Sequence, residues 1–297
     1  MASVDCSLRA LAMLALVCCA LASHPACAQP YPSQPIRLIV PFGPGSGSDI
    51  VARRLGSVLQ QRWKQPVVID NRPGAQGVIG TEALPYDPVK DFAHIALIGV
   101  GGSVALVPKD SPFKSVPELA AYAKAHPGKV FFGHADTSSQ VPAELLRAVA
   151  KLPIEGVAYK ASANIIVDLI GGQIQFAFFN TMTGSAQAST GRLVPIAITE
   201  AQRSPCWPGV PTVAETYPGF EVTFFVGVSA PRGVPPDVVA KLHDAIREAQ
   251  DDPKFKAPLE GVGLTFVRQG PGQYADFIGK EAQRWREQIK AAGLVAQ

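Results

Sequence analysis

Residues 36–49 read Ile-Arg-Leu-Ile-Val-Pro-Phe-Gly-Pro-Gly-Ser-Gly-Ser-Asp, and this stretch decides the fold. The β-branched run at 36–40 predicts a strand, and the Gly/Ser loop at 43–48 follows it. Apolar residues at helical spacing come next, from Ile50 to Leu59. A strand, a glycine-rich loop and a helix in this order form the first half of a βαβ unit.

The same alternation continues to the end of the chain. Strands are predicted at 67–69, 95–98, 104–107, 130–132, 156–159, 174–178, 194–198 and 222–228. Helices are predicted at 116–125, 141–150, 163–170, 236–250 and 272–292. Alternating strands and helices predict an α/β fold with mostly parallel sheets covered by helices.

Two turn-rich stretches suggest crossovers between two lobes. One is 104–112 and the other is 227–236, which holds three prolines. If both are crossover strands, lobe 1 is discontinuous, with residues 29–105 and 230–297, and lobe 2 comprises 106–229. Two α/β lobes joined in this way form a clamshell that binds ligands at the carboxyl ends of its strands. We expect the hinges at 104–107 and 227–230.

The first 28 residues have the layout of a secretory signal peptide. Arg9 precedes an uncharged run at 10–23, and Ala26-Cys27-Ala28 follows as a cleavage site. A retained membrane anchor and a lipoprotein modified on Cys27 are the alternatives. Cleavage after Ala28 predicts a periplasmic protein whose one remaining cysteine, Cys206, has no intramolecular partner.

Composition and motifs exclude several functions. Twenty-seven basic and 24 acidic residues give a net charge of +3, without the strong basic stripe of a nucleic-acid-binding protein,. The chain has no Gly-Lys-Ser/Thr phosphate loop and no His-Glu-x-x-His, and the mature part has no cysteine pair,. We therefore expect no enzymatic activity, no cofactor and no metal site.

Three predicted loops could together bind an anion. Gly45 and Gly47 allow close backbone approach, and Ser46 or Ser48 could cap the helix that follows. A second loop, 74–77, follows the next strand, and Thr137-Ser138-Ser139 precedes a helix of the other lobe. Helix starts expose unpaired N–H groups, which attract a carboxylate. The alternative interpretation of the first loop is a tight turn without a ligand.

Several ordered motifs resemble the Bug (TctC-like) extracytoplasmic solute receptors of tripartite tricarboxylate transporters. They are Tyr-Pro-Ser-Gln-Pro-Ile-Arg-Leu-Ile-Val-Pro-Phe at 31–42, Pro-Val-Val-Ile-Asp-Asn-Arg-Pro-Gly-Ala at 66–75, Gly-Thr-Glu-Ala at 80–83, Leu-Pro-Tyr-Asp-Pro-Val-Lys-Asp-Phe at 84–92, Leu-Ile-Gly-Gly-Gln at 169–173 and Pro-Thr-Val-Ala-Glu at 211–215.

The resemblance implies a two-lobed periplasmic-binding-protein (Venus flytrap, type II-like) fold. It implies a monomeric receptor that captures a small carboxylate without a cofactor and delivers it to integral-membrane permease subunits. The expected ligand-binding residues are Phe42, Gly45, Ser46, Gly47, Ser48, Asp49, Ala75, Gln76, Gly77, Thr137, Ser138, Ser139 and Asn180.

The chain departs from the family pattern, most clearly between Ala83 and Leu84. There, about 25–30 residues are absent, the length of one βα unit. Gln140-Val141 replaces His-Leu, Phe179 replaces an Asp, and Ser46 and Ser48 replace Gly and Thr. A degenerate receptor that has lost binding, a receptor serving a two-component sensor, and an enzyme on the same scaffold are therefore the alternative functions.

Overall fold

The computed structural model describes residues 31–73, 87 and 90–293. The predicted signal peptide, the loop at Ala75, Gln76 and Gly77, and the apparent deletion at Ala83 lie outside these residues. Residues 35–297 form one compact unit, and the description below concerns that unit.

The opening stretch folds as its sequence predicts. Strand β1 (Ile36–Val40) is followed by helix α2 (Gly47–Trp63) and strand β2 (Val67–Asn71). β1 and β2 pair in parallel, which a crossover helix makes possible,. α2 buries Val51, Leu55 and Leu59 on one face, at the spacing of an amphipathic helix,.

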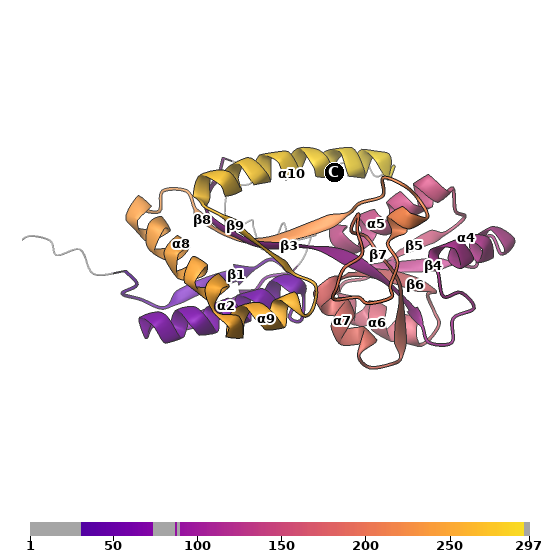
Figure 1. Ribbon diagram of the computed structural model, residues 1–297, viewed down its shortest axis with the longest axis horizontal. Coiled ribbons are helices and arrows are strands. Elements are labelled where there is room, and N and C mark those ends of the chain that lie inside the picture. Colours follow the sequence, from indigo (N-terminus) through magenta and orange to yellow (C-terminus); the bar gives the residue numbers. More distant parts are fainter. Residues whose placement is uncertain (1–30, 74–86, 88–89, 294–297) are drawn as a thin grey trace, which may run out of the picture. The chain divides into compact units, whose positions relative to one another are not determined.

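One long strand, β3 (Phe92–Pro108), runs through both lobes (Figure 1). Its first half pairs with β8 (Thr223–Pro231) and β9 (Thr265–Gln269), and its second half with β6 (Phe176–Asn180) and β7 (Leu193–Ile198). The partners change between Gly102, which faces Thr223, and Ser103, which faces Asn180. All four pairings are antiparallel, so the prediction of mostly parallel sheets is wrong for β3.

The second lobe is a sheet with the strand order β5-β4-β6-β3-β7. Strands β4 (Phe131–His134) and β5 (Glu155–Ala158) run parallel to each other, and β4 also runs parallel to β6. The remaining elements of this region are α4 (Val116–Ala125), α5 (Thr137–Ala150), α6 (Ser162–Ile170), α7 (Thr181–Ala188) and the 3₁₀ helix Val213–Glu215.

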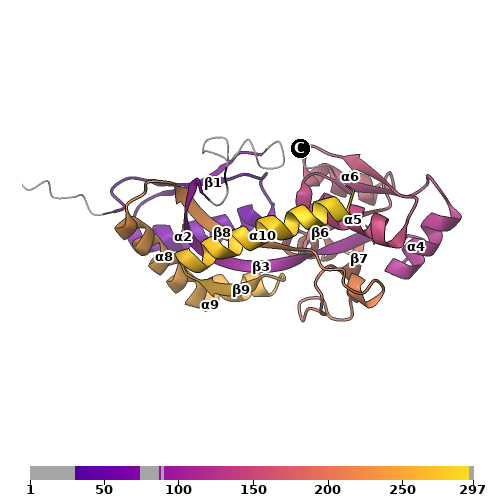
Figure 2. The ribbon, with the colours of Figure 1, turned by 90° about the horizontal axis from the view of Figure 1, so that it is seen from above.

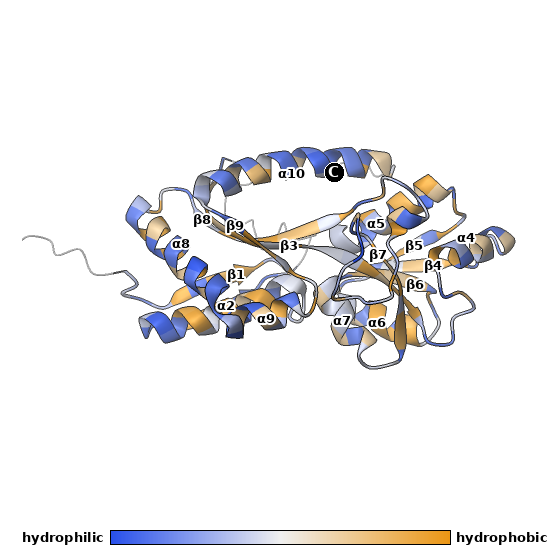
Figure 3. Cartoon of the chain, in the orientation of Figure 1, coloured by the Kyte–Doolittle hydropathy of each residue, from blue (hydrophilic) through white to orange (hydrophobic). Residues whose placement is uncertain are grey.

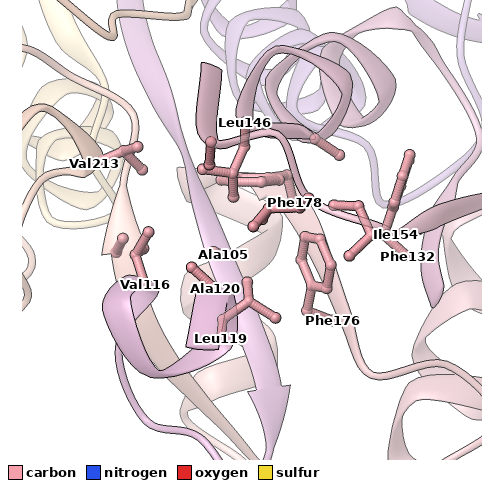
Figure 4. Packing of buried hydrophobic residues seen from close by; sticks show 14 of the residues in the cluster. Ala105, Val116, Leu119, Ala120, Phe132, Leu146, Ile154, Phe176, Phe178 and Val213 are labelled. Atoms are coloured by element: carbon pink, nitrogen blue, oxygen red, sulfur yellow. The ribbon is translucent and has the colours of Figure 1, made fainter. Parts of the chain in front are cut away.

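Aromatic side chains fill the core of this lobe. Phe132, Phe176 and Phe178 are fully buried, and the rings of Phe132 and Phe176 lie 5.7 Å apart (Figure 4). Leu119 of α4 and Leu146 of α5 belong to the same cluster. The central strands β3 and β6 are mostly apolar, and the long C-terminal helix is mostly hydrophilic (Figure 3).

Three helices complete the chain: α8 (Pro236–Asp251), α9 (Pro253–Glu260) and α10 (Pro271–Ala291). The buried Gln250 side chain donates to the carbonyl oxygens of Leu97, Ile98 and Val267, which ties α8 to two strands.

Helix α10 contacts the cores of both lobes (Figures 1 and 2). Tyr274 and Ile278 pack with Leu97 of the first lobe, whereas Trp285 and Ile289 pack against the core of the second. The long helix therefore bridges the two lobes.

Most of the predicted elements are confirmed, and the exceptions are specific. The strands expected at 95–98 and 104–107 are one strand, and α5 begins four residues earlier than expected. Strand β9 and helices α7 and α9 were not predicted. The lobe boundaries expected at 105/106 and 229/230 stay a prediction. For comparison, β3 changes its partners at Gly102–Ser103, and β8 begins at Thr223.

Candidate ligand-binding site

Three helices begin where three strands end, and each has a polar N-cap. α2 follows β1, α5 follows β4 and α7 follows β6. Ser46 Oγ accepts from the N–H of Asp49 at 3.3 Å, and Asp136 Oδ1 accepts from the N–H of Ser139 at 2.9 Å. Asn180 Oδ1 accepts from the N–H of Thr183 at 2.9 Å and so caps α7. These caps fix the direction in which each helix start points.

The start of α7 lies between the other two. The hydroxyl of Thr183 donates to the carbonyl oxygen of Gly45 at 3.3 Å. A Cβ atom added to Gly47 would lie 3.0 Å from Asn180 Oδ1. Ser103 faces Asn180 in the sheet, and its Oγ donates to the carbonyl oxygen of Ser138 at 3.4 Å. The two lobes therefore meet at these helix starts.

Each helix start keeps backbone N–H groups available. Within the described part of the chain, no acceptor is bound by the N–H groups of Gly47, Ser48, Ser138, Thr181 and Met182. These groups carry the positive end of the helix dipole, which favours a negatively charged ligand. The arrangement places backbone donors from both lobes at neighbouring helix starts.

Asp49 holds the first loop in shape. The residue is 2% exposed, and its side-chain oxygens accept from the Gly45 N–H, Arg53 Nε and Asn71 Nδ2, each at 2.9 Å. Burial raises the pKa of this carboxyl, but the hydrogen bonds from Arg53, Gly45 and Asn71 outweigh burial, so the pKa is lowered. Asn71 also donates to the carbonyl oxygen of Phe42 at 3.0 Å. Asp49 thus positions the loop with a charge that is already paired.

The loop before α5 is organised in the same way. Asp136 Oδ1 accepts from the Ser138 hydroxyl at 2.7 Å and from the Ser139 hydroxyl at 2.9 Å. Ser139 is buried, and its Oγ accepts from the N–H of Ala135 at 3.1 Å. Thr137 is half-buried and is the first residue of the helix. The two serine hydroxyls stabilise the loop, and the N–H of Ser138 remains available.

Sequence reasoning missed several residues at this edge. They include Ser103, Asp136 and Thr183, whose hydrogen bonds are given above, and Met182. His134 was also missed; it ends β4, and burial lowers its pKa although Asp136 favours the charged form. The usable signal was position, since His134 and Asp136 closely follow the strand predicted at 130–132. No such signal exists for Thr183, because its partner Gly45 is 138 residues away.

The N–H groups at the helix starts suit the binding of a negatively charged group. Among the described residues, no group of three or more His, Cys, Asp or Glu side chains could hold a metal ion. In the same part of the chain, no helix is both long enough and apolar enough to cross a membrane. The fold and these helix starts define a two-lobed binding protein of the periplasmic class.

Comparison with known proteins agrees with this class. A family described as "Tripartite tricarboxylate transporter family receptor" (TctC) matches residues 81–294. Protein BugT of Bordetella pertussis is 32% identical over 301 residues, covering 91% of this chain and 92% of that protein. The chain belongs to the TctC receptor family, which is a family of solute-binding receptors and not of enzymes.

Two solved structures are similar over most of the chain. One is R. palustris Rpa4515 with adipate, with a TM-score of 0.85, 27% identity, and coverage of 89% of this chain and 99% of that one. The other is MatC from Rhodopseudomonas palustris with bound malate, with a TM-score of 0.80, 27% identity, and coverage of 87% and 100%.

The alignment with BugT also bears on chain length. It has 301 positions but covers only 91% of the 297 residues, so about 30 positions of BugT have no counterpart here. That number fits the absence of one βα unit. The place expected for it, between Ala83 and Leu84, lies outside the described residues.

Proposed function

We propose that this protein is a periplasmic receptor that captures a small carboxylate and presents it to the permease subunits of a tripartite transporter. The available N–H groups at the starts of α2, α5 and α7 carry this proposal. The relatives solved with adipate and malate support the ligand class, since both are dicarboxylates. The predicted signal peptide at 1–28 supports the location.

The binding residues proposed are those whose backbone or side chain lies at the three helix starts. Gly45, Ser46, Gly47 and Ser48 act from the first lobe, and Asn180 acts from the second together with Thr137, Ser138 and Ser139. Phe42 and Asp49 complete the first loop, with Asp49 in a positioning role. The expected contributions of Ala75, Gln76 and Gly77 concern residues outside the described part.

Ligand binding would close the lobes about a hinge on β3. The expected hinge segments 104–107 and 227–230 are poor candidates, because Val104 pairs with strands on both sides and Gly227 pairs with Leu97. Gly102–Ser103 and 222–223 are better placed, because there the chain passes from one set of partners to the other.

A thermal-shift screen of the mature protein tests the proposal. The probes are adipate, malate, citrate, nicotinate and an amino acid. A ligand at one hundred times its Kd stabilises the folded state by about 2.7 kcal/mol, so Tm should rise with concentration. A rise with any carboxylate supports the receptor, whereas no rise with any of them favours the degenerate alternative. Isolation of an unchanged ligand excludes the enzyme alternative. Transport and sensing are separated by testing which membrane partner binds the liganded form.

A further inference from the structure

The second lobe carries an open pocket at the edge of its sheet opposite the helix starts. It has a volume of about 570 Å³ and lies beside the end of β3 and the amino ends of β4, β6 and β7. The candidate ligand site lies at the carboxyl ends of β4 and β6. The pocket therefore belongs to a different surface of the same lobe.

Three basic residues line this pocket: Lys109, Lys129 and Arg192. All three are exposed, and within the residues that the structure describes none of their side chains forms an ion pair or donates a hydrogen bond. Asp110 is the one acidic residue among those lining the pocket. The pocket thus has a surplus of cationic groups that the protein itself does not neutralise.

The backbone around these cations is firmly held. The N–H of Lys109 donates to the carbonyl oxygen of Arg192 at 2.9 Å. Lys114 donates to the carbonyl oxygen of Pro108 at 3.4 Å and so closes the turn. Gln175 Oε1 accepts from the N–H of Phe131 at 2.8 Å, which joins two strand starts. Because the backbone is already ordered by these hydrogen bonds, less conformational entropy is lost when a partner binds.

Apolar side chains also line the pocket. Pro108, Tyr122 and Ile174 line it together with Ile170 at the end of α6. One turn earlier on the same face of α6, Val167 is 68% exposed,. Apolar side chains beside charged ones are typical of a protein–protein contact, whereas a small inorganic anion needs only the charged groups.

We infer that this pocket, with Lys109, Lys129, Arg192 and the adjacent Val167, docks an acidic extracytoplasmic protein segment that carries an apolar side chain. The inference rests on the proposed function, because a receptor must present its ligand to a membrane protein. The position fits that role, since docking at this edge leaves the helix starts unobstructed. Charge complementarity identifies the partner as acidic.

The test uses the mature protein and a fluorescein-labelled nonapeptide of eight glutamates around a central leucine. Fluorescence anisotropy compares the parent with the pocket variant Lys109→Glu/Lys129→Glu/Arg192→Glu. The matched control is Lys241→Glu/Arg247→Glu/Lys280→Glu, which reverses three exposed charges on α8 and α10. We expect the pocket variant to lose at least tenfold in affinity and the control to lose less than threefold. Binding should also weaken in 0.5 M salt, because screening shortens the reach of exposed charges.

Several results would overturn the inference. They are no peptide binding by the parent, equal losses in both variants, and displacement of the peptide by inorganic phosphate alone. Preferential binding to anionic lipid vesicles in place of the peptide would assign the pocket to a membrane surface instead. If the carboxylate raises the Tm of the parent and of the pocket variant equally, the ligand site of the variant is intact. A failure of docking is thereby separated from a failure of the proposed function.

Discussion

The hydroxyl of Thr183 donates a hydrogen bond to the carbonyl oxygen of Gly45 at 3.3 Å and so joins the starts of α7 and α2. The two residues belong to different lobes. The proposed opening of the lobes would break this contact, and their closing on a ligand would restore it.

Thr183→Val should weaken carboxylate binding by roughly two- to tenfold, because one neutral hydrogen bond is worth about 0.5–1.5 kcal/mol. Isothermal titration with the best ligand from the thermal-shift screen measures the change. Thr190→Val is the control, since the Thr190 hydroxyl has only local partners: it donates to the Gln187 carbonyl oxygen and accepts from the N–H of Arg192. Equal affinities for the two variants would mean that the Thr183 contact plays no part in binding.

The two serines of the first loop should differ in their effect on stability. Ser46 caps α2, whereas Ser48 lies within the helix and caps nothing. The sequence left both serines as possible caps. Ser46→Ala should lower the free energy of unfolding by about 1 kcal/mol, and Ser48→Ala should change it by less than about 0.5 kcal/mol. Urea denaturation of both variants measures this, and the reverse order would refute the assignment.

A side chain at Gly47 would meet atoms of the second lobe as well as a bound ligand. A Cβ there would lie 2.6 Å from Met182 Cε and 3.0 Å from Asn180 Oδ1. From sequence alone, Gly47 was expected to allow the backbone to approach the ligand closely. The structure adds a second role, because a side chain here also meets the start of α7. Gly47→Ala should therefore push the starts of α2 and α7 apart and lower the affinity for the carboxylate.

A double mutant separates these two causes. Met182→Leu removes the Cε atom with little change in volume, a substitution that usually costs under about 1.5 kcal/mol. Adding Met182→Leu to Gly47→Ala should recover part of the lost affinity if the lobes are being forced apart. No recovery in isothermal titration would favour direct obstruction of the ligand.

Glu200 gives the protein a defined pH dependence. Its Oε1 accepts from the N–H of Gly102 at 3.2 Å, but its buried Oε2 has no partner among the described residues. Burial raises the pKa of this carboxyl above its ordinary value of 4.5. The folded state therefore binds this proton more tightly than the unfolded state does. As a result, the protonated carboxyl contributes to the free energy of unfolding at low pH, and this contribution is lost as the pH rises through the pKa of the folded state.

Glu200→Gln should consequently raise Tm at pH 7 and leave it nearly unchanged at pH 4. The amide keeps an oxygen for Gly102 and removes the buried charge. Thermal unfolding of parent and variant across this range measures the difference. A variant that is less stable than the parent at pH 7 would show that the charged carboxylate has a favourable partner.

The parts of the fold that were predicted correctly are those specified locally. The run at 36–40, the cap before α2 and the apolar spacing of α8 each depend on a few neighbouring residues. β3 was divided in two because glycines interrupt its apolar pattern. Gly99 and Gly102 are needed because Thr265 and Glu200 approach the strand from far along the chain. Sequence periodicity does not contain that information.

In the candidate site, too, the parts specified by neighbouring residues were predicted and those specified by distant residues were not. The capped loop before α2 was predicted from its Gly and Ser residues, whereas Thr137, Ser138 and Ser139, expected in a loop, form the first turn of α5 and the cap is Asp136. Helix α7 was missed because Thr181–Ala188 has no apolar stripe, and its place beside Gly47 follows from strand order alone. The assignment of Asp49 to the ligand changed to a positioning role, because Arg53 and Asn71 already hold its oxygens.

Backbone amide chemical shifts in ¹⁵N-labelled mature protein, titrated with the best carboxylate from the screen, test the central claim most directly. The account predicts that the largest saturable shifts occur at the N–H groups of Gly47, Ser48, Ser138, Thr181 and Met182, because these groups would donate to the ligand. Saturable shifts that leave these five amides unmoved and gather elsewhere would contradict it.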